Sequence, residues 1–109
     1  MTGQDRRIWG YLVIWEFLVR PGTEGRFQQL YEAGGEWSRL FQRADAYLGT
    51  DLIQDTRVPQ RYLTLDFWAS QAAYDRFRQD HVTQYKAIDE KGAALTESER
   101  EVGRFCRIP

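Results

Sequence analysis

The sequence of 109 residues has only one cysteine, Cys106, and only one histidine, His81. A single cysteine excludes an intrachain disulfide and suits a reducing cytoplasm. One histidine and one cysteine also leave no local zinc motif. The chain has no P-loop, no GxGxxG loop and no GxSxG elbow, so it shows none of the sequence signs of a nucleotide-binding protein or a serine hydrolase.

Long apolar runs and an excess of one charge are absent too. The most apolar stretch, residues 8–19, contains Glu16 and is too short to span a membrane. No signal peptide is recognisable. The net charge is −1, from 15 basic and 16 acidic residues, whereas nucleic-acid binding usually needs a basic face. The sequence therefore predicts a cytoplasmic domain that binds neither nucleic acid nor membrane.

Aromatic residues, in contrast, are abundant. Four Trp, six Tyr and six Phe make up 15% of the chain. A chain of this length forms one domain with one core, and it buries little surface beyond that core. Large flat side chains dominate interfaces and line pockets for flat ligands. The composition therefore predicts a subunit interface, an aromatic-walled cavity, or both.

The first strand is predicted over residues 8–19, a run rich in β-forming side chains. One face would carry Trp9, Tyr11, Val13, Trp15, Phe17 and Val19, and the other Ile8, Leu12, Ile14 and Leu18, with Glu16 as the exception. A strand that is apolar on both faces must be covered on both. The helices of this chain would cover one face and a second subunit the other, which predicts a homodimer.

A helix is predicted next, capped by Thr23 and divided into two pieces by Gly34 and Gly35. Two strands follow, over residues 46–55 and 61–68. The order then continues with a second helix and a last strand.

Ser70 is the predicted N-cap of that second helix. Its apolar side chains follow helical spacing through Tyr74, Phe77, His81, Tyr85 and Ile88. The sequence TESE at residues 96–99 has the spacing of a capping box and predicts a short helical turn. The last strand is then predicted over residues 102–108.

This order is βαββαβ, which is typical of ferredoxin-like α+β domains. We expect a four-stranded antiparallel sheet with both helices on one face and a second subunit on the other. Residues 1–109 would form one domain, with residues 1–7 as a frayed N-terminal tail.

Four stretches together resemble the antibiotic-biosynthesis-monooxygenase-like domains of the dimeric α/β-barrel superfamily. They are WEFLVRPGTEGRF, WSRLFQRADAYLGTDLIQD, RYLTLDFWASQAAYDRFRQDH and ALTESEREVGRF, within residues 9 to 106. The resemblance implies a homodimer in which two sheets close a barrel. It also implies a pocket between the sheet and the helices of each subunit.

The relatives in this superfamily include cofactor-free oxygenases of aromatic polyketides, haem-degrading monooxygenases and small quinol oxygenases. The family's Trp near the end of the third strand matches Trp68, and a Tyr six residues later matches Tyr74. An Asn expected four residues before that Trp falls at Thr64, and the chain contains no asparagine. The resemblance implies a cofactor-independent monooxygenase that acts on a small aromatic or quinone-like compound.

Two alternatives stay open. The departure at Thr64 favours a non-catalytic small-molecule-binding or structural dimeric protein. A haem-binding or haem-degrading protein would use His81, because the haem ligand of that branch lies on the same helix. The missing asparagine and a spacing from Trp68 that is about one turn too long count against haem.

The candidate catalytic residues are His81, Trp68, Tyr74 and Asp66. His81 can act as a base near neutral pH or can serve the structure alone. Trp68 can stack on a flat ligand or fill the core, and Tyr74 can orient a substrate oxygen or pack in the core. Asp66 can take a proton if burial raises its pKa, or can lie exposed on its strand. The candidate substrate-binding residues are Tyr62, Thr64, Trp15 and Phe77.

Overall fold

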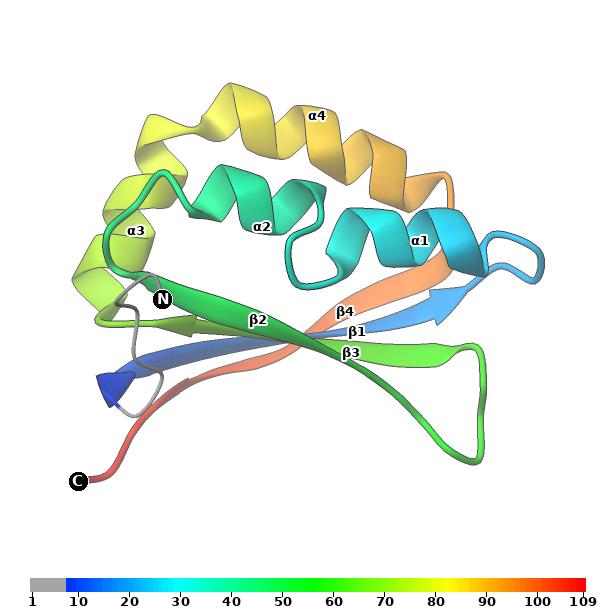
Figure 1. Cartoon of the computed structure of the whole chain (residues 1–109), viewed down its shortest axis with the longest axis horizontal. Coiled ribbons are helices and arrows are strands. Elements are labelled where there is room, and N and C mark those ends of the chain that lie inside the picture. The colour runs from blue at the N-terminus through cyan, green and yellow to red at the C-terminus, as the bar shows by residue number, and fades with distance from the viewer. Residues whose placement is uncertain (1–7) are drawn as a thin grey trace.

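All the helices lie on one face of a four-stranded antiparallel sheet. The computed structural model describes residues 8–109, so the predicted frayed tail lies outside the described residues. The elements are β1 (Tyr11–Val19), α1 (Glu24–Tyr31), α2 (Glu36–Phe41), β2 (Tyr47–Gln54), β3 (Arg61–Trp68), α3 (Gln71–Asp80), α4 (Val82–Ala93) and β4 (Thr96–Cys106). The strand order is β2-β3-β1-β4, and Figure 1 shows the helices above the sheet. This is the predicted α+β ferredoxin-like arrangement.

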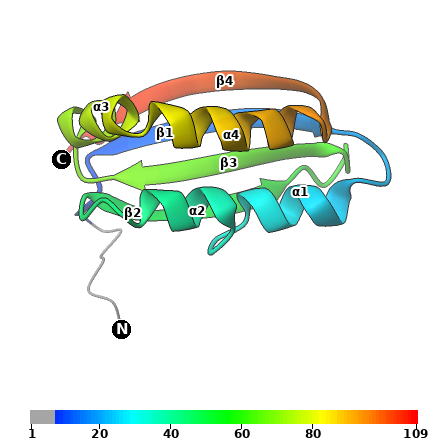
Figure 2. The same ribbon diagram turned by 90° about the horizontal axis from the view of Figure 1, so that it is seen from above.

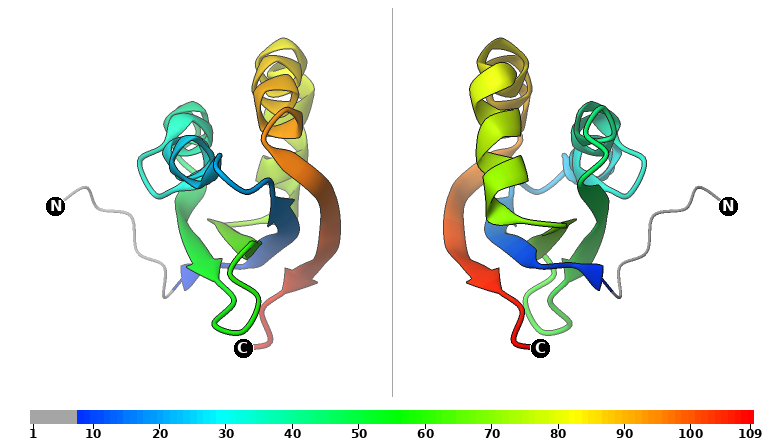
Figure 3. Two further views of the ribbon diagram at one scale, coloured as in Figure 1. Left: turned by 90° about the vertical axis from the view of Figure 1, so that its right-hand side faces the viewer. Right: turned by 90° about the vertical axis from the view of Figure 1, so that its left-hand side faces the viewer.

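The helices form two rows over the sheet. Figure 2 shows α1 and α2 following one another in one row and α4 in the other. In the end-on views of Figure 3 the two rows stand apart above the sheet. The ion pair between Lys91 Nζ of α4 and Glu36 Oε1 of α2, at 2.6 Å, links the two rows.

The strand alternation predicted for β1 is confirmed from Tyr11 to Val19, whereas Trp9 precedes the strand and its ring packs edge-on against Phe67 of the other face. Tyr11, Val13, Phe17 and Val19 are buried under the helices, and Leu18 on the other face is exposed. Residues of the neighbouring strands follow the same register, because Tyr11 pairs with Trp68, and Val13 with Asp66, on β3. Each strand thus presents one set of side chains to the helices and one to the opposite face.

That opposite face, here called the open face, is largely apolar. Its apolar side chains are Leu12, Ile14, Leu18, Ile53, Leu63, Leu65, Phe67 and Phe105. Phe105 and Ile53 remain 43% and 46% exposed. Glu16, the exception in the apolar strand, accepts hydrogen bonds from Arg61 Nε at 2.5 Å and Arg100 Nε at 3.2 Å. These two arginines lower the pKa of the Glu16 carboxyl.

The core takes up much of the aromatic excess. Trp68, Tyr47 and Phe27 are fully buried, and neighbouring rings meet edge to face or tilted, as aromatic pairs prefer. Trp68 contacts Phe41 with ring centroids 5.4 Å apart and Tyr74 at 5.3 Å.

The predicted second helix is in fact two helices, so that prediction was wrong. α3 ends and α4 begins at His81, whose backbone leaves the helical region with φ −129° and ψ 31°. The His81 ring stacks on Phe77 at 4.0 Å, and its Nδ1 hydrogen-bonds to the Phe77 carbonyl oxygen at 2.9 Å. The predicted cap is confirmed, because Ser70 Oγ accepts a hydrogen bond from the Ala73 amide at 3.2 Å.

The predicted helical turn at residues 96–99 was also wrong. These residues begin β4, which pairs with β1 from Thr96 opposite Val19 onward. The capping-box spacing misled because β4 is an edge strand, and edge strands carry charged residues that limit pairing with other chains. Two predicted strand ends also differ from the structure. The first strand begins at Tyr11 and not at residue 8, and the last strand ends at Cys106 and not at residue 108.

Candidate functional site

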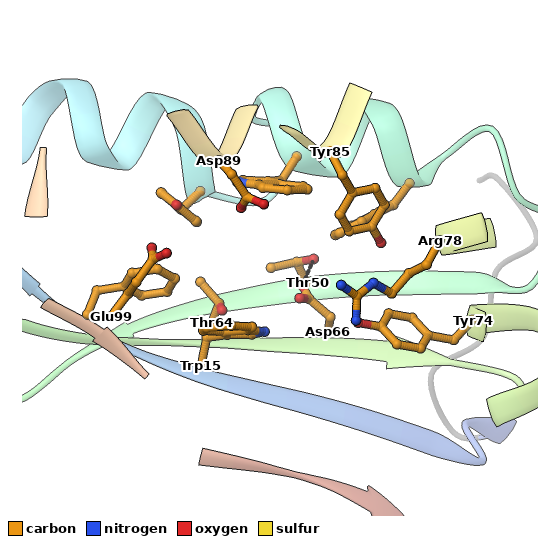
Figure 4. A pocket seen from close by; sticks show the side chains of 13 residues that line it. Trp15, Thr50, Thr64, Asp66, Tyr74, Arg78, Tyr85, Asp89 and Glu99 are labelled. Carbon is orange, nitrogen blue, oxygen red and sulfur yellow. Dashed lines mark hydrogen bonds between the residues drawn. The ribbon is translucent and has the colours of Figure 1, made fainter. Parts of the chain in front are cut away.

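A cavity of about 140 Å³ lies between the sheet and the helices. Each of the eight elements contributes at least one lining side chain. The walls are aromatic: Trp15, Phe17, Tyr31, Trp37, Phe41, Tyr74 and Tyr85. The polar side chains are Thr50, Thr64, Asp66, Arg78, Asp89 and Glu99, and Figure 4 shows them around the same space. An apolar cavity with a few convergent polar groups is the usual form of a small-molecule site.

Asp66 is the carboxylate on the sheet side of this cavity. It lies on β3, opposite Thr50 of β2, and Thr50 Oγ1 donates a hydrogen bond of 2.6 Å to Asp66 Oδ1. No hydrogen bond from residues 8–109 reaches the other carboxylate oxygen. Burial raises the pKa of Asp66 to about 6, against the opposing effect of the Thr50 hydroxyl. Asp66 can therefore both hold and release a proton near neutral pH.

Two further hydroxyl groups extend from Thr50 away from the cavity. The Tyr47 hydroxyl lies 2.5 Å from Thr50 Oγ1, and Ser38 Oγ of α2 lies 3.0 Å from the Tyr47 hydroxyl. All three residues are buried. Asp66 thus lies at the end of a row of hydrogen-bonded hydroxyls.

Two tyrosines and an arginine occupy one end of the cavity. Arg78 Cζ lies 5.8 Å from the ring centroid of Tyr74 and 5.4 Å from that of Tyr85. Figure 4 shows these three side chains beside one another. Burial raises the pKa of both tyrosines, so their hydroxyls are hydrogen-bond donors at neutral pH. The Tyr85 hydroxyl is buried and has no hydrogen-bond partner among residues 8–109. A ligand oxygen in the cavity would satisfy it.

Two carboxylates lie on the helix side and at the far end of the cavity. Asp89 comes from α4 and Glu99 from β4, and both side chains are exposed. Partial burial raises the pKa of both carboxyls; Asp89 raises that of Glu99 further, and Arg78 opposes the rise at Asp89. The cavity is therefore cationic at the Arg78 end and anionic near Asp89 and Glu99.

Residues 10–91 match the family model described as antibiotic biosynthesis monooxygenase. The chain belongs to this family. A comparison with curated proteins gives no match, so the family relationship rests on the family model.

Among solved structures, two oxygenases are similar to this member of the antibiotic biosynthesis monooxygenase family. The ActVA-Orf6 monooxygenase of Streptomyces coelicolor, in complex with nanaomycin D, is 15% identical with a TM-score of 0.76, over 94% of this chain and 91% of that one. SnoaB, a cofactor-independent oxygenase from Streptomyces nogalater, is 15% identical with a TM-score of 0.75, over 93% and 95%. At these identities the similarity shows a shared fold.

Four of the predicted site residues line the cavity of this family member. They are Asp66 and Tyr74 from the catalytic set and Thr64 and Trp15 from the substrate-binding set. The other four lie elsewhere: Trp68, Tyr62 and Phe77 are buried in the core, and His81 is half-buried at the junction of α3 and α4. Trp68 contacts the ring of Tyr74, so it supports a lining residue from behind.

Sequence reasoning did not assign a role to Thr50, Arg78, Tyr85, Asp89 or Glu99. Tyr85 was placed on the inward face of the second helix, which was the only signal that pointed to it. The other four are polar residues on amphipathic strands and helices, where polar side chains normally face solvent, so their positions gave no sign of a site. Only the packing of α3, α4 and β4 around the sheet brings them together.

Residues 8–109 contain no group of three or more His, Cys, Asp or Glu side chains that could hold a metal ion. None of the helices in this described part of the chain is long and apolar enough to cross a membrane.

Proposed function

We propose that this protein is a cofactor-independent monooxygenase that acts on a small aromatic or quinone-like compound. The observation that carries the proposal is Asp66, a carboxylate with a pKa of about 6 beside an aromatic cavity. Membership of the antibiotic biosynthesis monooxygenase family supports it, as does the description of SnoaB as a cofactor-independent oxygenase.

The first step would be removal of a proton from an activated phenol or methylene carbon of the substrate. Asp66 would take this proton on the carboxylate oxygen that Thr50 leaves free. The negative charge then spreads onto the substrate oxygen, where the hydroxyls of Tyr85 and Tyr74 can donate hydrogen bonds. Both tyrosines line the cavity beside Arg78, whose positive charge favours the same anion.

The oxygen step uses electrons of the substrate itself. The carbanion passes one electron to dioxygen, and the resulting radical and superoxide combine to form a carbon–oxygen bond. Protonation gives a hydroperoxide, which loses water to leave a carbonyl group. For a methylene carbon the balance is CH₂ + O₂ → C=O + H₂O, so no external reductant is consumed. The aromatic walls, including Trp15 and Trp37, would hold a flat substrate and limit access of water.

Oxygen consumption tests this proposal directly. Chelator-treated protein would be given a panel of anthrones and hydroquinones, and wild type would be compared with Asp66→Asn. The amide keeps the shape but cannot act as a base, so kcat/KM should fall by about 100-fold or more. Asp80→Asn is the matched control, since Asp80 is exposed at the end of α3 and lies outside the cavity lining. Uptake that is unchanged in Asp66→Asn would contradict the assigned base.

A non-catalytic binding protein is the second candidate, and Thr64 is the observation that favours it. Thr64 lines the cavity where the family resemblance implies an asparagine, and none of the lining residues carries an amide. Equilibrium dialysis with the same panel separates the two functions: retention of a compound without oxygen uptake would identify a binding protein.

The structure does not fit a haem site around His81. Its Nδ1 is bonded to the Phe77 carbonyl oxygen, its ring is stacked on Phe77, and His81 does not line the cavity. No step is therefore assigned to His81 or to haem, and its predicted catalytic role stays a prediction.

The same proposal includes the homodimer and the cytoplasmic location predicted from the sequence. The apolar open face supports the dimer, because Phe105 and Ile53 are exposed there and large exposed apolar patches mark interaction sites. The free, exposed thiol of Cys106 supports a reducing compartment.

A further inference from the structure

We infer that Thr50, supported by Tyr47 and Ser38, is a positioning residue for Asp66: it keeps this carboxylate ionised and directs one of its oxygens into the cavity. This inference rests on the proposed function for its catalytic meaning. The hydrogen bonds on which it depends are properties of the ligand-free protein.

The hydroxyls of Ser38, Tyr47 and Thr50 and the carboxylate of Asp66 form one continuous hydrogen-bonded row. Ser38 Oγ, the Tyr47 hydroxyl and Thr50 Oγ1 are separated by 3.0 Å and 2.5 Å, and Thr50 Oγ1 lies 2.6 Å from Asp66 Oδ1. Ser38 and Thr50 are each 4% exposed, and Tyr47 is 0% exposed. Water therefore does not compete for these hydrogen bonds, and in such surroundings each is stronger than at a surface.

The row has a definite direction when Asp66 is ionised. A carboxylate only accepts hydrogen bonds, so Thr50 must donate its single hydroxyl proton to Asp66 Oδ1. Thr50 Oγ1 then accepts the Tyr47 proton, and the Tyr47 oxygen accepts the Ser38 proton. Each link raises the donor strength of the next, because hydrogen bonds in a chain polarise one another. The row as a whole thus stabilises the charged form of Asp66.

The two oxygens of the Asp66 carboxylate thereby take different roles: one is held by Thr50 and the other can accept the substrate proton. Oδ1 is occupied by Thr50, whereas no residue among 8–109 donates to the other oxygen. Because Thr50 anchors Oδ1, the free oxygen keeps a fixed position at the cavity. A base with one anchored oxygen meets the substrate proton without first reorienting, which is how preorganised sites gain rate.

Other charged and titratable groups face the same space and must be held constant in any test. They are Tyr31 of α1, Tyr74 and Arg78 of α3, Tyr85 and Asp89 of α4 and Glu99 of β4. None of these donates a hydrogen bond to Asp66. Substitutions within the hydroxyl row leave all six in place.

The test is the pH profile of kcat/KM in Thr50→Val, with Thr50→Ser as the matched control. Loss of the hydroxyl removes a group that stabilises the carboxylate. The apparent pKa of the acid limb, the low-pH side on which kcat/KM falls as Asp66 takes up a proton, should therefore rise by about one unit. At pH 6 the ionised fraction of Asp66 would fall from about one half to about one tenth, and kcat/KM about fivefold. At pH 9 Asp66 is ionised in both proteins, so kcat/KM of Thr50→Val should stay below that of wild type there only by the lost anchoring of Oδ1. Thr50→Ser keeps a hydroxyl and should restore the wild-type limb.

The more distant links should act in a graded and non-additive way. Tyr47→Phe should move the limb in the same direction by less than Thr50→Val does, and Ser38→Ala by less again. Once Thr50→Val has broken the row, adding Tyr47→Phe should produce no further movement. Equal limbs in Thr50→Val and wild type, or a full additional shift in the double variant, would overturn the inference.

A titration without substrate separates this inference from the proposed function. Carbon-13 NMR of the aspartate carboxyl groups, with Asp66 assigned from its missing signal in Asp66→Asn, gives its pKa in the ligand-free protein. A higher pKa in Thr50→Val than in wild type and Thr50→Ser supports the row even if no compound in the panel is oxidised. An unchanged pKa overturns it even if wild type consumes oxygen.

Discussion

At the scale of single residues, buried hydroxyl groups fall into two kinds. Tyr47 is paired on both sides, by Thr50 and Ser38, whereas the buried hydroxyl of Tyr85 has no partner among residues 8–109. An unpaired buried polar group costs free energy that a paired one does not. Proteins tolerate such a cost where a ligand later supplies the partner.

Removing these two hydroxyls should therefore have opposite effects on stability. Tyr85→Phe should raise the free energy of unfolding of the ligand-free protein by about 1 kcal/mol, because it deletes an unsatisfied donor. Tyr47→Phe should lower it by about 1 kcal/mol, because it removes the hydrogen bonds of the Tyr47 hydroxyl with Thr50 Oγ1 and with the buried Ser38 Oγ. Urea denaturation followed by circular dichroism measures both. A loss of stability in Tyr85→Phe similar to that in Tyr47→Phe would show that the Tyr85 hydroxyl is satisfied.

The sequence was more informative about residue faces than about residue roles. Asp66 and Thr64 were placed on the correct strand face because β3 alternates regularly. The hydrogen bond from Thr50 to Asp66 depends on the register between β2 and β3, which a bulge shifts between Tyr47 and Gly49. No local pattern encodes that register, so the hydroxyl row became visible only in three dimensions.

At the scale of elements, the break between α1 and α2 is set by close backbone contact. A Cβ atom at Gly35 would lie 2.7 Å from the carbonyl oxygen of Gln29 and 2.9 Å from that of Glu32. The Gly35 amide also donates to the Glu32 carbonyl oxygen at 2.8 Å. The start of α2, which carries Ser38 and Trp37, is thus fitted tightly against the end of α1.

Gly35→Ala should consequently disturb more than the helix boundary. The clash with backbone oxygens should lower the free energy of unfolding by about 2 kcal/mol. Gly25→Ala is the matched control, since Gly25 lies in α1 with nothing within 4 Å of a Cβ atom there, and it should raise stability by about 0.5 kcal/mol. Thermal unfolding of the two variants checks the pair. Equal effects would show that the clash relaxes without cost.

Element types could be predicted where the apolar periodicity is strong, and the prediction failed where charged residues dominate. Strands β2 and β3 were found to within about one residue of their observed ends, and the first helix was correctly divided near Gly34 and Gly35. β4 was missed in its first half because Thr96, Glu97 and Ser98 resemble a helix start. The break between α3 and α4 falls at His81, which contacts Phe77 through its ring and its Nδ1. The helical spacing of apolar residues continues across His81 and therefore did not predict this break.

At the scale of the whole molecule, the two faces of the sheet differ in what covers them. The helix face encloses the cavity, whereas none of the helices among residues 8–109 covers the apolar side chains of the open face. The ion pairs of Glu16 with Arg61 and Arg100 lie in the midst of this apolar surface. A second copy placed there would bury both the apolar side chains and these paired charges.

Phe105→Glu should therefore weaken the proposed dimer. Symmetry places the new carboxylate in the interface twice, so the dissociation constant should rise by at least about 100-fold. Val82→Glu is the control, because Val82 lies on α4 and is 64% exposed. Light scattering coupled to gel filtration at micromolar concentration compares the two. A monomeric wild type would refute the dimer, and a dimeric Phe105→Glu would place the interface elsewhere.

The cavity takes lining side chains from each of the eight elements, so no part of the fold can open without dismantling it. Any compound that occupies the cavity must bind the native state alone and must raise the melting temperature of the entire chain. At a concentration of 100 times its dissociation constant, such a compound adds about 2.7 kcal/mol to the stability. A thermal-shift screen of compound libraries can therefore detect ligands of this cavity before any turnover is observed, and a hit is assigned to the cavity when Asp66→Asn or Tyr85→Phe changes its shift.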